Sequence, residues 1–217
     1  MATDDTRARI LSAAGPIFAL KGFRDATVRE ICEAAGVGLA SVNYHFQDKQ
    51  QLYVRVVEHA YDYLQRSKPP RLDDVPPMPA EQRLREWLHR LARKVLAEQQ
   101  QSWHERLLSR EFRDPTPACE DFLRQRLNAD LAPLLDTLRD VLPATTSAAE
   151  RWHLAYLVLG QVLFYDTYRG FIRVLGGGAA DPATFAPEQV ADRIARFTAA
   201  ALGLRTTLLV LPPGENP

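Results

Sequence analysis

Apolar residues recur at helical spacing along most of the chain, in segments that prolines and glycines separate. The buried face of a first predicted helix, which ends at Gly22, consists of Ile10, Ala14, Ile17 and Phe18. The pair Gly15-Pro16 lies inside this helix. Because proline removes a helical hydrogen bond and clashes with the preceding turn, we expect a kink there. No segment alternates apolar and polar residues as a strand does, so the pattern predicts an all-α fold.

Two short helices joined by glycine are predicted next. Thr27 is a good N-cap residue and Glu30 occupies the matching capping-box position, so a helix starts at Thr27. Its apolar face is formed by Val28, Ile31, Cys32 and Ala35. Gly36 lies where a residue with positive φ would end this helix and turn the chain.

The second short helix, residues 38–44, spans only about two turns and needs tertiary packing to be stable. We assign that packing to Val37, Val42 and Phe46. The remaining surface carries short or planar polar side chains suited to phosphate oxygens and base edges in a major groove, namely Ser41, Asn43, Tyr44 and His45. Asp48 offers an N-cap for the next helix, and Lys49 lies beside that helix's N-terminus, where a phosphate is favoured.

The helical pattern then continues to about residue 202. The predicted segments are 48–66, a proline-rich linker over 67–79, then 81–101, 103–112, 118–142, 147–175 and 187–202. Pro133 interrupts the segment 118–142, which is therefore either kinked or two short helices. The segment 147–175 is the longest and most apolar, and Pro187 lies in the first turn of the last helix. The tail from Thr206 either packs against a neighbour or is loose.

The block Asn43-Tyr44-His45-Phe46, followed by Lys49 and Leu52-Tyr53, resembles the TetR family of one-component bacterial transcription regulators. The resemblance extends over residues 10–23, 27–37 and 41–53, about a fifth of the chain. It implies an N-terminal three-helix helix-turn-helix DNA-binding domain over residues 1–60. It also implies a C-terminal helical effector-binding and dimerisation domain over residues 61–205, followed by a tail over 206–217.

Candidate DNA contacts follow from this resemblance. It places family contact positions at Thr27, Ala40, Asn43, Tyr44, His45 and Lys49. Ala40 and Asn43 are suited to bases, through a thymine methyl group and a base-edge hydrogen bond, whereas the others would mostly hold phosphates. Ser41 belongs to the same polar surface, and Arg29 would add to a local basic surface. Without the resemblance, the pattern fits equally well the end of a three-helix bundle with a solvated face.

A dimer interface and an effector pocket are also implied by the family. The segment 152–168 is apolar almost all round, which indicates burial on more than one side. The resemblance implies that the last two helices pair with those of a second subunit, with small Ala155 and Gly160 permitting close approach; core packing in a monomer is the alternative. The candidate ligand-binding residues, some of which would be ordinary core, are Trp103, Arg106, Phe112, Phe122, Trp152, Tyr156, Phe164 and Tyr168.

Composition narrows the remaining possibilities. The net charge is zero, and the first 66 residues balance eight Lys and Arg against eight Asp and Glu, which argues mildly against nucleic-acid binding. Two cysteines are too few for a disulfide framework, and the five histidines lack zinc-like spacing, so we expect no metal site and no cofactor. There is no catalytic constellation, no membrane-spanning stretch and no signal-peptide pattern, so we expect a cytoplasmic protein and not an enzyme.

The function expected from these observations is that of a homodimeric repressor of transcription. It would bind double-stranded DNA at a palindromic operator and leave it when a small, largely apolar or aromatic effector binds. A ligand-independent regulator or an activator of the same fold remains an alternative. A helical adaptor protein and an all-α enzyme that keeps the helix-turn-helix as a scaffold are less favoured.

Overall fold

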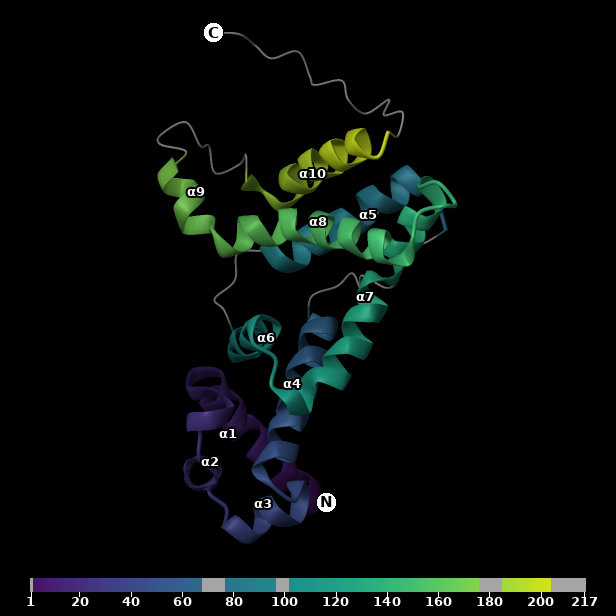
Figure 1. Cartoon of the computed structure of the whole chain (residues 1–217). Coiled ribbons are helices and arrows are strands. Elements are labelled where there is room, and N and C mark those ends of the chain that lie inside the picture. The colour runs from purple at the N-terminus through teal and green to yellow at the C-terminus, as the bar shows by residue number, and fades with distance from the viewer. Residues whose placement is uncertain (1, 68–76, 97–101, 176–184, 204–217) are drawn as a thin grey trace. The chain divides into compact units, whose positions relative to one another are not determined.

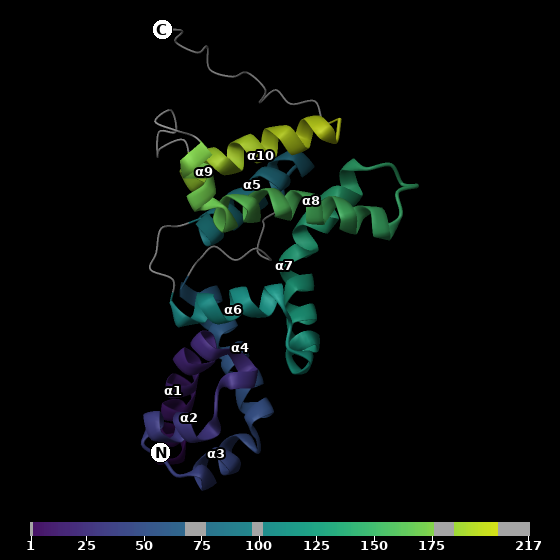
Figure 2. The same ribbon diagram turned by 60° about the vertical axis from the view of Figure 1, so that its left-hand side comes forward.

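The computed structural model describes residues 2–67, 77–96, 102–175 and 185–203 (Figures 1 and 2). The helices in these ranges are α1 (Ala2–Asp25), α2 (Val28–Ala35), α3 (Leu39–Phe46), α4 (Lys49–Ser67), α5 (Ala80–Leu96), α6 (Trp103–Arg113), η1 (Pro117–Cys119), α7 (Glu120–Val141), α8 (Ala148–Thr167), α9 (Arg169–Leu175) and α10 (Pro187–Ala201). The described ranges contain no strand, which confirms the predicted all-α fold. None of the described helices is long and apolar enough to cross a membrane.

The helices group into two compact units, each with its own apolar core. The first unit contains α1 to α4, α6, η1 and α7 as far as Leu127. The second contains α5, α7 from Asn128 onward, and α8 to α10. The domain bounds predicted from the sequence put α6 and the start of α7 in the C-terminal domain, whereas in the structure these helices pack with the helix-turn-helix.

The core of the first unit is formed where α1, α4 and α6 meet. The ring of Phe18 in α1 meets that of Tyr53 in α4 edge to face, with ring centroids 4.8 Å apart. Gly15 in α1 faces the indole ring of Trp103 in α6, and a Cβ at Gly15 would overlap that ring. The glycine therefore permits α6 to lie directly against α1.

The break in α1 lies at Gly22, not at Pro16. The only residue inside α1 with non-helical dihedral angles is Gly22, at φ 77° and ψ −178°. Positive φ favours glycine, and a Cβ at Gly22 would overlap the guanidinium group of Arg110. The expected end of the first helix at Gly22 thus matches the break in geometry, while Pro16 lies within the helix and the kink expected there stays a prediction.

The second unit is built around α5, α8 and α10, which lie side by side in both views (Figures 1 and 2). The buried side of α5 faces this core, and its largest side chain, Trp87, is 1% exposed. The Trp87 Nε1–H group donates to the carbonyl oxygen of Asp130 in α7 at 3.1 Å. The buried indole therefore has the hydrogen-bond partner that its polar edge requires.

Two of the predicted segments are divided into helices differently from the alternatives that the sequence suggested. Pro133 lies within one continuous helix, α7, where its carbonyl oxygen accepts a hydrogen bond from the Thr137 hydroxyl at 2.8 Å. The segment 147–175 is not one helix, because Tyr168, at φ −107° and ψ 21°, separates α8 from α9. The final helix begins with Pro187 in its first turn, as predicted. Most of the linker and the tail after Thr206 lie outside the described residues.

Candidate DNA-binding surface

Local capping interactions determine where α2 begins and ends. The Thr27 hydroxyl oxygen accepts a hydrogen bond from the Glu30 backbone N–H at 3.2 Å, and the Glu30 carboxylate accepts one from the Thr27 N–H at 3.1 Å. Gly36 ends the helix in the left-handed region, at φ 63° and ψ 41°. The capping box and the glycine turn predicted from the sequence are both present.

Lys21 adds a charged contact at the start of α2. Its ammonium group lies 2.5 Å from a Glu30 carboxylate oxygen. The Lys21 hydrogen bond, followed by that from the Thr27 backbone, lowers the pKa of Glu30 below its ordinary value. Glu30 therefore stays ionised at neutral pH, as the capping box and the positive end of the helix dipole favour.

Arg9 in α1 binds the turn between α2 and α3. Its guanidinium group donates to the carbonyl oxygens of Ala35 at 2.7 Å and Gly36 at 3.1 Å. These carbonyls lie at the C-terminal end of α2, where helical partners are lacking and positive charge is favoured. Arg9 thus connects α1 to the turn that orients α3, and no pattern in the sequence identified it.

The recognition helix α3 is held by its two buried residues. Val42 is 0% and Phe46 3% exposed, as expected from their spacing, while Val37 in the turn is half-buried against the same core. The Arg7 guanidinium carbon lies 5.6 Å from the centroid of the Phe46 ring. The opposite side of α3 is open to solvent, which is the arrangement a major-groove helix needs.

Most of the predicted contact residues lie on or beside this open side. Ala40 and Asn43 are exposed, and the Tyr44 side chain is 77% exposed. Ser41 and His45 are half-buried at the edges of α3, and the His45 ring meets Tyr44 edge to face, with centroids 5.0 Å apart. The structure thus presents these five side chains on one short helix, and their contacts to DNA stay predictions.

The three other predicted contact residues have partners within the first unit. Thr27 is the N-cap of α2, and the Arg29 guanidinium pairs with Glu33 one turn later at 3.0 Å, at an exposed position. The Lys49 ammonium donates to the carbonyl oxygen of Arg24 at 3.1 Å and lies 4.9 Å from the centroid of the Phe23 ring. Lys49 therefore caps the C-terminal end of α1, a role that the sequence analysis did not assign to it.

The helix after α3 begins as predicted. The Asp48 carboxylate accepts a hydrogen bond from the Gln51 backbone N–H at 2.7 Å, which is an N-cap interaction. Between the two helices, Gln47 takes φ 66°, the only positive φ of a non-glycine residue in the described ranges. Such a conformation is uncommon for residues other than glycine, so the exit from α3 is a strained turn held by its neighbours.

The predicted ligand-binding residues fall into two groups. Trp103, Arg106, Phe112 and Phe122 belong to the first unit, whereas Trp152, Tyr156 and Phe164 on α8 and Tyr168, directly after α8, belong to the second. Within the second group the rings pair along the helix, with centroids 5.6 Å apart for Trp152 and Tyr156 and 4.9 Å apart for Phe164 and Tyr168. Tyr156, Phe164 and Tyr168 are about half exposed, so they do not line an enclosed cavity within their own unit.

A groove between α5 and α10 contains none of these residues. It has a volume of about 50 Å³, small against the ~300–1,000 Å³ of pockets for drug-sized ligands. Its lining is Glu81, Leu84, Arg85, Asp192, Ala195, Arg196 and Ala199. The groove therefore offers little room for an effector.

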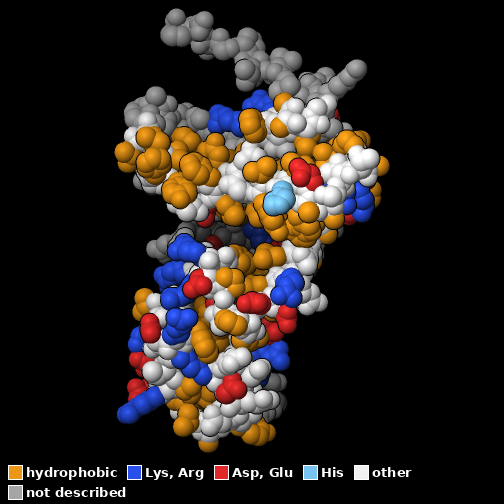
Figure 3. Space-filling view, in the orientation of Figure 1, with side chains coloured by type: hydrophobic (Ala, Val, Ile, Leu, Met, Phe, Trp, Pro, Cys, Tyr) orange, Lys and Arg blue, Asp and Glu red, His pale blue; other side chains and the backbone are white. Residues whose placement is uncertain are grey.

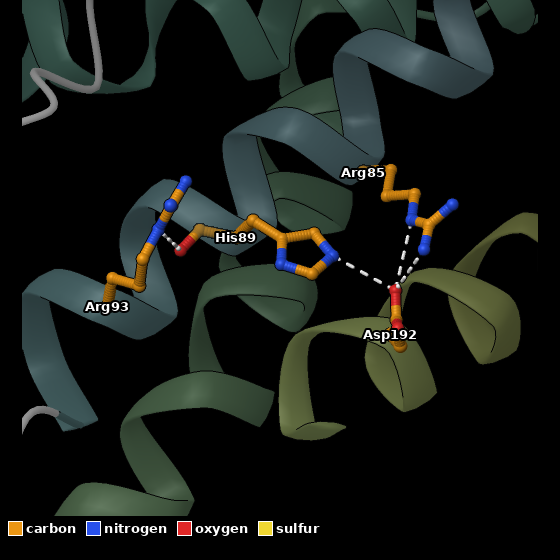
Figure 4. A network of polar contacts seen from close by, with 4 residues as sticks. All are labelled: Arg85, His89, Arg93 and Asp192. Atoms are coloured by element: carbon orange, nitrogen blue, oxygen red, sulfur yellow. Dashed lines mark hydrogen bonds and ion pairs between the residues drawn. The ribbon is translucent and has the colours of Figure 1, made fainter. Parts of the chain in front are cut away.

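Polar contacts beside this groove link α5 to α10 (Figure 4). Asp192 Oδ1 accepts hydrogen bonds from Arg85 Nε at 3.0 Å and from His89 Nε2 at 2.9 Å. Burial alone would raise the pKa of Asp192, but the hydrogen bonds from His89 and Arg85 outweigh it and lower this pKa. Arg93 Nε donates to the His89 carbonyl oxygen at 3.4 Å within α5. These contacts position α10 against α5.

Large apolar side chains gather on α8 and α9 (Figure 3). On α8 they are Tyr156, Leu157, Leu163 and Phe164, and Tyr168 follows directly after this helix. Phe197 on α10 is 69% exposed. Gly160 lies among them with open space around its Cα, whereas Ala155 is completely buried in its own unit. The predicted role of Ala155 at a subunit interface is therefore wrong, while Gly160 is accessible.

The described residues contain no group of side chains arranged to hold a metal ion. Both cysteines are buried, and burial followed by the nearby Glu111 carboxylate raises the pKa of Cys119 to about 12. Cys32 also has a raised pKa because it is desolvated. Both thiols thus stay protonated at neutral pH and behave as core residues.

Comparisons with solved structures identify the fold. A transcriptional regulator of Streptomyces coelicolor is 21% identical, with a TM-score of 0.55 over 90% of this chain and 97% of that one. A TetR-family regulator of Mesorhizobium loti is 19% identical, with a TM-score of 0.54 over 93% and 98% of the two chains. A gamma-butyrolactone receptor is 20% identical, with a TM-score of 0.50 over 91% and 100%. No curated protein sequence matches the chain.

Two family models match successive parts of the sequence. Residues 10–56 match the model of the tetR family of bacterial regulatory proteins. Residues 80–202, more than half of the chain, match the C-terminal domain of the HTH-type transcriptional dual regulator CecR. The helix-turn-helix geometry, the all-α fold and these matches agree. The chain belongs to the TetR family of DNA-binding transcription regulators, with a C-terminal domain of the CecR type.

Proposed function

We propose that the protein is a homodimeric repressor that binds a palindromic operator and leaves it when a small, largely apolar or aromatic effector binds. The observation that carries the proposal is the open side of α3, where Asn43 and the 77% exposed Tyr44 stand beside a buried anchor of Val42 and Phe46. Side chains of this kind suit base edges and phosphates in a major groove.

The apolar surface of α8 and α10 supports the dimer. Isolated exposed apolar residues are common, but a continuous set of this size marks an interaction surface. Gly160 would allow the α8 helices of two copies to approach closely. Two recognition helices in successive major grooves lie about 34–36 Å apart, so the operator should be a near-palindrome.

The test is fluorescence anisotropy of the purified full-length chain with DNA from upstream of its own gene. Scrambled DNA of equal length is the competitor, because much of the affinity for any DNA is electrostatic and salt-dependent. Selective binding with two protomers per site supports the proposal. Equal weak binding to both DNAs, together with failure to select any sequence from a random library, contradicts it.

Tyr44→Ala separates DNA contact from folding in the same assay. The exposed ring can be removed without opening the core, so the variant should keep its dimer and its unfolding temperature while losing operator binding. Tyr44→Phe is the matched control, because it keeps the ring and removes only the hydroxyl group that would hold a phosphate. Loss of the dimer in Tyr44→Ala would mean that Tyr44 is a structural residue.

The effector is best located with the three tryptophans of the chain. Trp103 lies among aromatic rings of α4 and α6, Trp152 lies on α8, and Trp87 is buried in the core of the second unit. Variants with a single remaining tryptophan can be screened with apolar and aromatic compounds that release DNA. Quenching of Trp103 alone or Trp152 alone would indicate which group of predicted residues contacts the effector, and quenching of neither would contradict both assignments.

Activation of transcription is the second candidate. The CecR family model describes that protein as a dual regulator, so regulation in both directions has a precedent in the matched family. Reporter genes driven by the promoters next to each selected operator distinguish the two. Repression should be the dominant effect when the operator overlaps the promoter.

A further inference from the structure

The open side of α3 changes character along its length. Leu39 and Ala40, at the N-terminal end, are both exposed and have no side-chain hydrogen-bonding group. Asn43 and Tyr44, one turn later, supply the polar groups of this side. The N-cap residue Gly38 adds no side chain, and the space around its Cα is open. The N-terminal end of α3, the end whose residues contact base edges in helix-turn-helix proteins, is therefore apolar.

Leu39 is an exposed apolar residue at the start of α3. Its side chain is 57% exposed and is not among the apolar residues that pack against the core of the first unit. The helix is anchored instead by Val42 and Phe46, three and seven residues later, so Leu39 lies at the N-terminal end of the helix beyond this packed part. A leucine at this position leaves apolar surface in water, which costs free energy unless a partner covers it.

Among groups on the base edges in a major groove, the thymine 5-methyl is apolar, whereas the other edge groups need hydrogen-bond partners. Placing Leu39 against a guanine, adenine or cytosine edge would desolvate those groups without replacing their hydrogen bonds. We propose that Leu39 is a specificity-determining residue that recognises a thymine methyl group in each operator half-site, beside the one assigned to Ala40. This inference rests on the proposed DNA-binding function.

The experiment begins with selection of operator sequences from random duplexes by the wild-type protein. Each thymine of the selected half-site is then replaced by deoxyuridine, which removes the methyl group and leaves base pairing unchanged. We expect one replacement to weaken wild-type binding roughly three- to tenfold. Leu39→Ala should weaken binding to the thymine operator by a similar factor and should no longer distinguish thymine from deoxyuridine at that position.

Two controls isolate the methyl contact. Asn43→Ala should weaken binding but keep the full sensitivity to deoxyuridine at the Leu39 position, because it removes a different contact. A C·G pair bearing 5-methylcytosine at that position should bind wild-type protein better than unmodified C·G, since it restores a methyl group. The unfolding temperature of Leu39→Ala should match that of the wild type.

The outcomes separate this inference from the proposed function. Selective binding by the wild type with no loss on any deoxyuridine replacement would overturn the role of Leu39 and leave the regulator intact. Leu39→Ala that keeps the wild-type sensitivity at every thymine would overturn it as well. Failure of the wild type to select any sequence would reject both the DNA-binding function and the inference.

Discussion

At the scale of single residues, two long cationic side chains hold the helix-turn-helix together by capping helix ends. Arg9 donates to the last carbonyls of α2, and Lys49 donates to the Arg24 carbonyl near the end of α1. Carbonyl groups at helix C-termini lack helical partners and carry partial negative charge, so a cation satisfies both needs. The orientation of α3 thus depends on residues outside it.

Arg9→Ala should weaken operator binding about tenfold and lower the free energy of unfolding by about 1–2 kcal/mol, because two carbonyls lose a charged donor. The operator affinity and the stability of Arg9→Lys should lie between those of the wild type and Arg9→Ala, since one ammonium group cannot reproduce the guanidinium geometry. DNA anisotropy and urea unfolding measure the two effects. An Arg9→Ala variant with wild-type affinity and stability would show that the turn does not need this clamp.

At the scale of elements, α6 is joined to the helix-turn-helix through a buried carboxylate. Glu111 is 1% exposed, and one of its oxygens accepts a hydrogen bond from the Tyr53 hydroxyl at 2.6 Å. Thr116, in the turn after α6, donates its backbone N–H at 3.0 Å and its hydroxyl at 2.8 Å to the same carboxylate. Burial, and then the bond to Glu111, raises the pKa of Tyr53, so its hydroxyl remains a donor at neutral pH.

Tyr53→Phe should destabilise the first unit by about 1–3 kcal/mol, since a buried carboxylate loses a donor. Glu111→Gln should cost a similar amount alone, because its amide oxygen can still accept from Tyr53 but its NH2 group then faces the Thr116 N–H donor. The double variant in chemical unfolding then gives the coupling between α4 and α6. Strictly additive effects would mean that this hydrogen bond does not connect the two helices.

A second contact between α4 and α6 should respond to pH. His104 is buried, its ring stacks on Tyr63 with centroids 3.8 Å apart, and its Nδ1 has no hydrogen-bond partner. Burial, then the neighbouring His59, lowers the pKa of His104 to about 4, despite the opposing Glu105. Burial also lowers the pKa of His59, where Arg66 and Arg7 add to the effect and Asp62 opposes it.

As the pH falls, His104 in the unfolded chain binds a proton at a higher pH than it does in the folded protein. The contribution of neutral His104 to the free energy of unfolding should therefore be complete above about pH 6.5 and decrease as the pH drops toward 4. From pH 7.5 to 5 we expect a loss of about 1–2 kcal/mol attributable to His104. His104→Phe should lose less over that interval in urea unfolding, whereas His153→Gln, at an exposed position of α8, should follow the wild type. Identical pH profiles for His104→Phe and wild type would refute the assignment.

At the scale of the whole molecule, the exposed apolar side chains of α8 and α10 form the surface through which we propose that two copies associate. Phe197 is 69% exposed on α10, so Phe197→Arg should leave the core of its own unit intact. We expect the variant to be monomeric at micromolar concentration and to lose operator affinity by at least about 100-fold, since one recognition helix alone binds weakly.

Sedimentation velocity and DNA anisotropy measure these two effects. The matched control is Leu20→Arg, the same change at a 77% exposed leucine of α1, which should remain dimeric. A dimeric Phe197→Arg protein would place the subunit interface elsewhere on the molecule.

The sequence alone determined the features that arise from short-range interactions. Two of them are hydrogen bonds between residues three positions apart, from Glu30 to Thr27 and from Gln51 to Asp48. The third is the turn at Gly36, which depends on one backbone conformation. Capping and glycine preferences are therefore readable from the chain itself, and helical periodicity indicated the all-α fold and the buried Val42 and Phe46.

Only the tertiary structure decided the interactions between distant segments. Arg9 reaches a turn 26 residues away, and Tyr53 bonds Glu111 across 58 residues, which no local pattern records. The same holds for the packing of α6 against α1 at Gly15, which groups α6 with the helix-turn-helix. Periodicity likewise could not distinguish buried Ala155 from open Gly160, because the side of α8 that faces its own core depends on where α5 and α10 pack.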